Sequence, residues 1–401
     1  MDVRQVNELF EAAKRLAADS RALRDALEVE FLGRQLWEVV AEDYDLGEIL
    51  GVDQVFGGYV NVSFSVRTQT KDGEHRYFVR KYKGATTERE VRFEHALVTH
   101  LNGKGFHLAA PVLPARTGST FVTREESLDG ETVTRLFAVY EMLGGMDKYT
   151  WVKNHCTDKE YASAARVLAD FHHVGHDFDP GELARAQPPI MEFLHSLNAT
   201  LTSCAARGRG GSYDECLLLT LPRILEVLEK GLAIEAELVG MPFIPVHCDY
   251  HPGNQKYVDE QVVGLFDFDW SKIDYRVFDV ALALVYFCSS WEGRDTGDLW
   301  VDKCGLFLDA YQDESARFDV PGPLTASELA VLPRMLANAN LFVLQWCASA
   351  YYENLEANDD EYLFYLQHNV ALMDFIERHQ DELEGMARAA EVAGGREAGV
   401  A

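Results

Sequence analysis

The sequence predicts an α+β fold in which a small lobe with an antiparallel sheet is followed by a large, mostly helical lobe. Residues 59–70 and 77–82 are rich in β-branched and aromatic side chains, and residues 71–73 between them are a turn signal. Beyond Gly145, apolar residues recur at helical spacing through most of the chain. A chain of 401 residues, 47% hydrophobic and 25% charged, is long enough for two domains that each bury a core.

The other elements of the small lobe follow in order along the chain. Residues 88–101 have helical spacing, and the Asn-Gly pair that follows them is typical of a helix end. Residues 119–123 and 134–142 have the composition of two further strands, before glycines 144–145 break the pattern. This order of strand, strand, helix, strand, strand favours a small α+β lobe.

The large lobe is predicted to be helical except for the strand-like segment 244–269. Residues 205–213, which contain three glycines, have the composition of a flexible loop. Helices are expected at residues 158–175, 187–205, 214–239, 278–291, 300–312, 325–354 and 359–390.

The predicted domain plan has four parts. Residues 1–40 form an N-terminal helical extension, residues 41–143 the small lobe, residues 144–390 the helical lobe and residues 391–401 a flexible tail. The extension alternates apolar and charged residues at helical spacing, so we expect it to pack on the small lobe or on a second copy in a homodimer.

The charge balance disfavours two classes of partner. The chain carries 65 acidic and 37 basic residues, a formal net charge of −28, which repels nucleic acid and an anionic membrane surface. The excess of acid is explained either by solubility alone or by a preference for cationic substrates.

The cysteines and the apolar runs predict a cytoplasmic protein. Seven cysteines without CxxC spacing suggest reduced thiols rather than disulfides or a zinc site. No uninterrupted apolar stretch near the N-terminus fits a signal peptide, and the longest apolar run, Val280–Cys288, is too short to span a bilayer.

The segments VHCDYHPGN (246–254) and GLFDFDW (264–270) carry the chemistry. His247, Asp249 and Asn254 fit the HxDxxxxN spacing of a kinase catalytic loop. Short strand patterns on both sides of residues 259–260 predict a hairpin, and a turn centred between residues 260 and 261 would place Asn254 directly opposite Asp267.

This arrangement suits phosphoryl transfer from ATP. The reaction needs Mg²⁺ held by hard oxygen ligands, which Asn254 and Asp267 supply, and a carboxylate that orients the attacking hydroxyl, which Asp249 supplies. His247 is predicted to anchor the loop rather than act as a base. Asp279 is either a simple helix N-terminal carboxylate or also a brace for the catalytic loop.

The small lobe offers parts for nucleotide binding. Gly57, Gly58 and Asn61 lie at the start of the first hairpin, where small residues let backbone N–H groups approach phosphates, although a plain turn explains the glycines equally well. Residues 76–92 hold six basic and two acidic residues. Either Arg80 or Lys81 pairs with the ATP phosphates and is held in place by Glu94, or the segment is simply a solvated strand edge. Because strand faces alternate, only one of the two points inward.

Taken in order, the segments GGYVN, YFVRKYKG, RFEHALVTHL, VYEMLGG, LADFHH, HCDYHPGN and GLFDFDW resemble the superfamily of aminoglycoside phosphotransferases, choline kinases and type II homoserine kinases. The resemblance spans roughly residues 45–350. It implies a two-lobed, protein-kinase-like fold that binds ATP and Mg²⁺ in its cleft and phosphorylates a hydroxyl of a small molecule.

Carried over by position, the resemblance implies that Asp249 is the catalytic base and that Asn254 and Asp267 are the metal ligands. It favours Arg80 over Lys81 as the cation that pairs with the phosphates. It also implies a hinge whose backbone meets the adenine, formed by Glu141, Met142 and Leu143. Cys248 stands where a glycine is common, and a small buried thiol fits that place.

The acceptor is the least determined part of the prediction. Asp269, Trp270, Tyr275 and Trp346 could contact it, although aromatic residues more often belong to the core. We expect an ATP- and Mg²⁺-dependent phosphotransferase that acts on a small amine, amino alcohol or sugar-like metabolite. The alternatives are a protein Ser/Thr kinase, for which no A-P-E segment follows Asp267, and a non-catalytic nucleotide-binding module.

Overall fold

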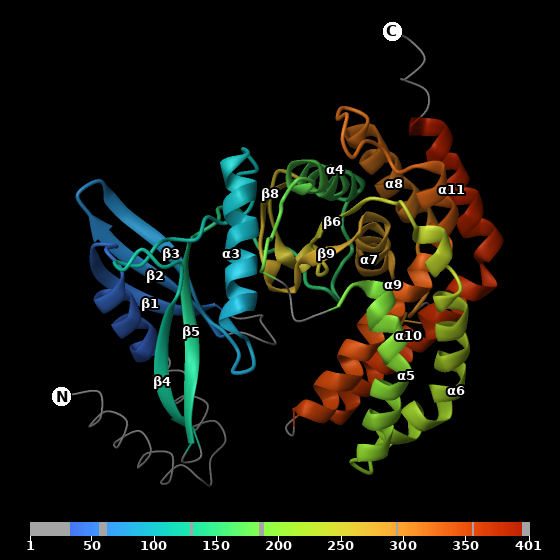
Figure 1. The fold of residues 1–401 in the computed structure, drawn as a ribbon, viewed down its shortest axis with the longest axis horizontal. Helices are drawn as coiled ribbons and strands as arrows, with labels where there is room; N and C mark the ends of the chain where they lie inside the picture. The colour runs from blue at the N-terminus through green and yellow to red at the C-terminus, as the bar shows by residue number, and fades with distance from the viewer. Residues whose placement is uncertain are drawn as a thin grey trace. The chain divides into compact units, whose positions relative to one another are not determined.

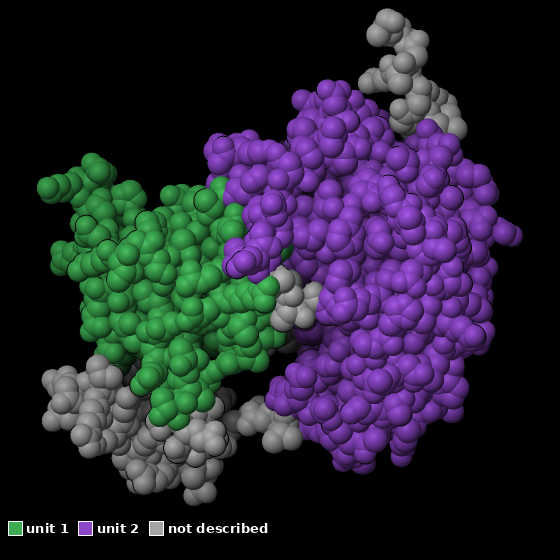
Figure 2. All heavy atoms as spheres, in the orientation of Figure 1, with its two compact units in different colours: residues 1–99, 110–143 green, residues 100–109, 144–401 purple. Residues whose placement is uncertain are grey.

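The computed structural model describes residues 33–55, 62–128, 131–183, 188–293, 296–354 and 357–394. The chain divides into two compact units, which Figure 2 shows in green and purple. Unit 1 comprises residues 1–99 and 110–143, and unit 2 comprises residues 100–109 and 144–401. The predicted α+β class is confirmed.

Unit 1 is built on a five-stranded antiparallel sheet with the order β1-β2-β3-β5-β4 (Figure 1). The strands are β1 (Glu48–Val55), β2 (Val62–Thr70), β3 (Gly73–Lys81), β4 (Val122–Leu128) and β5 (Glu131–Glu141). Strand β1 was not predicted from the sequence; among the described residues it pairs with β2 alone, and it has a bulge between Ile49 and Gly51. The bulge interrupts the alternation that identifies a strand, so that Ile49 and Val52, three residues apart, both pack against the core.

Both faces of the sheet of unit 1 are covered. Successive residues of β5 point to opposite sides, and each side joins a different core. Phe137 and Val139 join a core that includes Leu36 and Val40 of a helix at residues 33–43. Leu136 and Ala138 join a second core with Val91 of α3 (Glu88–Gly103). The last residues of α3, from His100 on, group with unit 2.

Unit 2 is mostly helical (Figure 1). Two small antiparallel sheets lie among the helices and pair β6 (Phe243–Val246) with β9 (Lys272–Tyr275) and β7 (Gln255–Val258) with β8 (Gln261–Leu265). The helices are α4 (Asp158–Gly175), α5 (Ile190–Arg207), α6 (Ser212–Leu232), α7 (Arg276–Cys288), α8 (Val301–Ser315), α9 (Ala326–Glu353), α10 (Asp359–Arg378) and α11 (Gln380–Gly394).

Two predicted helices differ from the structure. The span 359–390 is two helices, because α10 ends at Arg378 and α11 starts at Gln380. The span 214–239 is α6 followed by a separate 3₁₀ turn at Glu235–Leu238. At both junctions the hydrophobic spacing continues while the backbone changes, so periodicity alone does not reveal the break.

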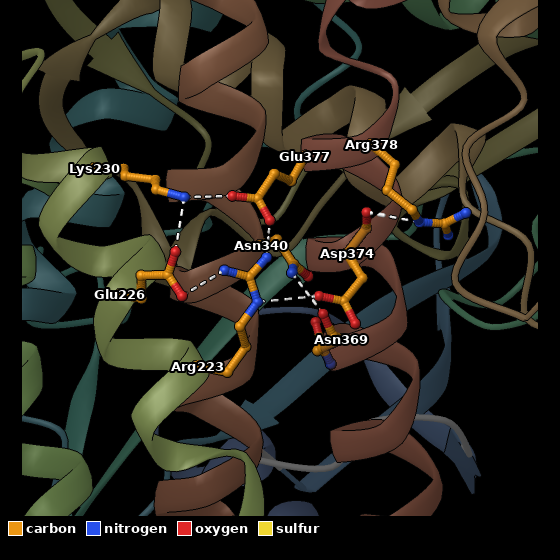
Figure 3. A network of polar contacts seen from close by, with 8 residues as sticks. All are labelled: Arg223, Glu226, Lys230, Asn340, Asn369, Asp374, Glu377 and Arg378. Atoms are coloured by element: carbon orange, nitrogen blue, oxygen red, sulfur yellow. Dashed lines mark hydrogen bonds and ion pairs between the residues drawn. The ribbon is translucent and has the colours of Figure 1, made fainter.

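The helices α6 and α10 are joined by a network of charged residues (Figure 3). Arg223 of α6 pairs with Asp374 and Glu377 of α10 as well as with Glu226 on its own helix, and Lys230 pairs with Glu226 and Glu377. These side chains are partly exposed, so each pair contributes little to the free energy of unfolding. The network therefore sets which faces of the two helices meet more than it stabilises them.

Candidate active site

The predicted catalytic loop lies between β6 and β7 in unit 2. It is stretched over residues 247–254, with Cys248 in the left-handed region at a φ of 63°. The imidazole Nδ1 of His251 accepts a hydrogen bond from Gly253 N at 3.0 Å and so caps a short 3₁₀ turn at Pro252–Asn254. A non-glycine residue with positive φ is unfavourable unless its surroundings fix it.

Asp279, in the first turn of α7, fixes that strained backbone. Its carboxylate accepts hydrogen bonds from His247 N and Cys248 N, both at 2.9 Å. His172 of α4 adds a contact of 3.1 Å from Nε2, and its Nδ1 lies 2.8 Å from Tyr311 Oη. Burial opposes ionisation of Asp279, but these hydrogen bonds hold its pKa below the ordinary value. Asp279 does not open the helix, since α7 begins three residues earlier at Arg276; it lies in the first turn and holds the backbone of the loop.

Asp249 and Asn254 are held together within the loop. Asn254 donates from Nδ2 to the backbone oxygen of Asp249 at 2.9 Å and to its Oδ2 at 2.8 Å. His251 Nε2 lies 3.6 Å from the same Oδ2. Burial raises the pKa of Asp249, but the contacts with His251 and Asn254 lower it by more. The pKa therefore lies below its ordinary value, and the carboxylate is ionised at neutral pH. Its side chain is 22% exposed and can be reached from outside.

The hairpin that follows has a different register from the one predicted. Gln255 pairs with Leu265 and Val258 with Gln261, so the turn is formed by Asp259 and Glu260, both at positive φ. A bulge next to Lys256 adds one residue to β8. The prediction that Asn254 lies directly opposite Asp267 is therefore wrong, because the turn is centred one residue earlier and the bulge makes up only part of the shift.

Asn254 and Asp267 are nevertheless neighbours along the ladder. Phe266 N donates to Asn254 O at 3.1 Å, so the backbone of Asn254 is bonded to the residue just before Asp267. His247 Nε2 lies 3.2 Å from Phe266 O and ties the loop to the same strand end. Burial lowers the pKa of His247, which keeps the imidazole neutral. Asp267 itself adopts a φ of 69°.

In unit 1, Arg80 and Lys81 lie on opposite faces of β3. The guanidinium of Arg80 is 3.5 Å from the carboxylate of Glu94, and both side chains are about 95% buried, with 5% and 4% exposed. Lys81 faces the other way, where it forms an ion pair of 2.5 Å with Glu126 and a hydrogen bond of 3.0 Å with Gln35. Of the two candidate cations, Arg80 is the one beside Glu94.

The predicted hinge lies at the end of β5, in the last residues of unit 1. Glu141 ends β5 and donates from its backbone N to Pro111 O at 2.9 Å, and Met142 and Leu143 follow it to the end of unit 1. Gly57, Gly58 and Asn61 lie outside the described residues.

The four candidate acceptor contacts belong to unit 2. Asp269 is buried in a 3₁₀ turn directly after Asp267. The Trp270 ring lies 6.2 Å from Phe342, and the Tyr275 ring lies 5.0 Å from Phe243. The Trp346 ring lies 5.7 Å from Trp151. The three rings each pack against another aromatic residue of unit 2 and are only half-buried.

Several residues beside the catalytic loop were missed from the sequence. The Tyr286 ring lies 5.4 Å from that of His251, and Asn154 donates to Tyr286 O at 2.8 Å. Trp151 contacts Trp291 and Trp346 at 4.9 and 5.7 Å. His251 could have been suspected from its place inside the HxDxxxxN motif, whereas residues 146–157 show no periodicity that would single out Trp151.

Comparison with known proteins identifies the family of the chain. Residues 54–315 match the model of the phosphotransferase enzyme family, which is more than half of the chain. The chain belongs to this family. This phosphotransferase is 26% identical over 306 residues to a homoserine kinase of Xanthobacter autotrophicus, and the match covers 76% of the chain and 82% of that kinase. The resemblance stated from the sequence is confirmed, and the chain is a small-molecule kinase by class.

Solved structures share the fold of this phosphotransferase. A microcompartment-associated aminopropanol kinase is similar with a TM-score of 0.63 and 17% identity over 88% of this chain and 98% of that one. An amicoumacin kinase in complex with AMP-PNP, Ca²⁺ and Ami is similar with a TM-score of 0.59 and 14% identity over 89% of this chain and 96% of that one. The predicted protein-kinase-like fold is confirmed.

Among the described residues, no helix is long and apolar enough to cross a membrane.

Proposed function

We propose that this phosphotransferase moves the γ-phosphate of ATP to a hydroxyl of a small polar metabolite that carries an amine. The observation that carries the proposal is the hydrogen bond of 2.8 Å from Asn254 Nδ2 to Asp249 Oδ2. This bond lies beside the end of β8, which Asp267 follows. Phosphoryl transfer is mostly a matter of positioning and charge, so one carboxylate fixed next to hard oxygen ligands is what it requires.

Asp249 is the residue that we assign to the acceptor hydroxyl. The hydroxyl oxygen bonds to the γ-phosphorus while the bond between that phosphorus and the β,γ-bridging oxygen breaks. The hydroxyl proton goes to the Asp249 carboxylate, and ADP leaves with the electron pair of the broken bond. The depressed pKa of Asp249 keeps the carboxylate ready to accept the hydroxyl's hydrogen bond at neutral pH.

The residues around Asp249 fit a magnesium ion. Both donor contacts of the Asn254 amide nitrogen go to Asp249, which fixes the amide and turns its oxygen away from that residue. That oxygen and the Asp267 carboxylate are the hard ligands that Mg²⁺ prefers. Mg²⁺ usually keeps several waters and binds substrate phosphates, so the pair would share the ion with phosphates and water. When bound, Mg²⁺ offsets the charge of the phosphates.

Unit 1 supplies the nucleotide contacts in this proposal. Arg80, paired with Glu94, is assigned to the ATP phosphates, and the backbone of residues 141–143 to the adenine. The solved relative with AMP-PNP supports a nucleoside triphosphate as donor.

An amine-bearing acceptor is supported by charge and by relatives. The net charge of −28 favours cationic substrates, and relatives are named as kinases of homoserine and aminopropanol. The test is to incubate the chain with ATP and Mg²⁺ and a panel of hydroxylated amines, including these two compounds, each beside its deoxy analogue. We expect ADP release and a phosphorylated product with at least one member and with none of the deoxy analogues.

Two outcomes would contradict the proposal. Labelling of generic protein substrates without any small-molecule product would favour a protein kinase. Nucleotide binding without turnover across the panel would favour a non-catalytic module.

A further inference from the structure

A buried polar cluster in unit 1 surrounds the carboxylate that pairs with Arg80. Glu94 accepts a hydrogen bond from Tyr140 Oη to Oε1 at 2.9 Å and another from Tyr82 Oη to Oε2 at 2.9 Å. Both tyrosines are at most 5% exposed. Tyr82 directly follows β3 and Tyr140 lies on β5, while Glu94 is on α3, so the two phenols reach the carboxylate from the sheet.

The neighbouring residue on α3, His95, completes the cluster. Its Nε2 lies 3.1 Å from Tyr82 Oη and 2.9 Å from Tyr140 Oη, and its Nδ1 lies 2.7 Å from Thr120 Oγ1. Burial and the nearby charges of Arg80 and Arg92 lower the pKa of His95 to about 3, so the imidazole is neutral and carries one proton.

The two phenols also contact each other, since their Oη atoms lie 2.6 Å apart. Burial and the Glu94 charge raise the pKa of both tyrosines, so each phenol keeps its single proton, and the carboxylate only accepts. The two phenol protons are therefore shared among the contact between the phenols and their contacts with Glu94 and His95. The carboxylate is contacted by both phenols, whose oxygens are in turn held by His95 and by each other.

The same rings border the cation. The guanidinium carbon of Arg80 lies 5.7 Å from the centre of the Phe78 ring and 5.9 Å from those of Tyr82 and Tyr140. A buried cation is costly unless charge and polarisable surface compensate it, and a planar guanidinium can stack on aromatic faces while several of its N–H groups point at a carboxylate. The cluster is thus built for arginine at position 80.

We propose that Tyr82, Tyr140 and His95 are positioning residues that hold Glu94 so that Arg80 is presented to the polyphosphate of a nucleoside triphosphate. This inference rests on the proposed function, in which Arg80 pairs with the phosphates. A purely structural cluster that only docks α3 on the sheet would affect folding. A positioning cluster affects nucleotide affinity in the folded protein as well.

The test compares Tyr82→Phe, Tyr140→Phe and the double variant with Tyr44→Phe. Tyr44 is 1% exposed and belongs to the core on the other face of the sheet, so it is a matched loss of a buried hydroxyl. A hydrogen bond to a charged group is worth about 1.5–3 kcal/mol, so we expect about a tenfold or larger rise in the ATP dissociation constant and in the KM for ATP in the double variant. The KM for the acceptor should stay within about twofold.

If the double variant does not fold, the single variants Tyr82→Phe and Tyr140→Phe test the inference. Each should raise the ATP dissociation constant, whereas Tyr44→Phe should not. Unchanged ATP affinity in folded single or double variants would overturn the inference. An equal rise in both KM values would also overturn it. Failure of the wild-type chain to bind ATP by calorimetry would instead refute the proposed function, so the two failures can be told apart.

Discussion

At the scale of single residues, the candidate site depends on a few carboxylates whose surroundings are fixed. Asp279 holds two backbone N–H groups of the catalytic loop, and Asp249 is held by Asn254. The motif spacing predicts Asp249, Asn254 and Asp267 as the site, because phosphoryl transfer with Mg²⁺ needs a carboxylate beside hard oxygen ligands. It could not reveal His172, whose contact with Asp279 joins residues that are 107 positions apart.

Replacement of Asp279 by asparagine tests the loop brace. An amide has one acceptor oxygen where the carboxylate has two, so one of the N–H groups of His247 and Cys248 loses its partner, at a cost of about 1–3 kcal/mol. We expect a fall in kcat of about tenfold or more, with little change in ATP affinity. The matched control is Asp302→Asn, an exposed aspartate in the first turn of α8. Equal kcat values for the two variants would argue against the brace.

Two buried histidines predict how stability depends on pH. Burial lowers the pKa of both His95 and His368 to about 3, from about 6.5 in an unfolded chain. Below pH ~6.5 the unfolded chain therefore binds more protons than the folded one. The contribution of the two neutral histidines to the free energy of unfolding is complete above that pH and is lost progressively as the pH falls to ~3. Each histidine should lower the free energy of unfolding by up to about 1.4 kcal/mol per pH unit in that window.

Urea unfolding at a series of pH values between neutral and about 4.5 measures this slope. His368→Asn should reduce the slope by the share of one histidine, whereas His75→Asn, at an exposed strand position, should leave it unchanged. An identical slope in the His368 variant and the wild type would show that the imidazole is protonated in the folded protein.

At the scale of elements, helices with clear signals were predictable and the small strands were not. The span 158–175 agrees at both ends with α4, whose capping box joins Thr157 and Glu160. The hairpin of β7 and β8 was placed in the wrong register, because strands of four and five residues give too little alternation to reveal a bulge. Edge strand β1 was missed for a related reason.

Two ion pairs between helices of unit 2 differ in burial. We therefore expect the removal of one negative charge to lower the free energy of unfolding by very different amounts in the two places. Arg276 of α7 and Glu328 of α9 form a pair at 2.6 Å with both side chains fully buried. Glu328→Gln should therefore lower the free energy of unfolding by about 3–5 kcal/mol, because it leaves a buried cation uncompensated. Glu377→Gln, in the partly exposed network of Figure 3, should cost less than about 1 kcal/mol.

Chemical denaturation of both variants at low and moderate salt checks this contrast. Only the cost of Glu377→Gln should shrink as salt is added, since exposed pairs are screened. Similar costs for the two variants would mean that the Arg276 pair is hydrated.

At the scale of the whole molecule, each unit holds one part of the proposed chemistry. Unit 1 pairs Arg80 with Glu94, and unit 2 carries the loop with Asp249 and Asn254. The two-lobed plan followed from composition and periodicity because sheet and helix patterns change near residue 145. The acceptor did not follow, since the aromatic candidates are spread over several elements and each packs against a different aromatic residue.

The measurement that tests the central claim most directly compares Asp249→Asn with the wild type under saturating ATP, Mg²⁺ and acceptor. If Asp249 orients the acceptor hydroxyl and takes its proton, kcat falls by about 10²–10⁴-fold. The ATP dissociation constant should stay within about threefold, because the contacts assigned to the nucleotide lie elsewhere. A variant that binds ATP normally and keeps full phosphotransfer would contradict the account.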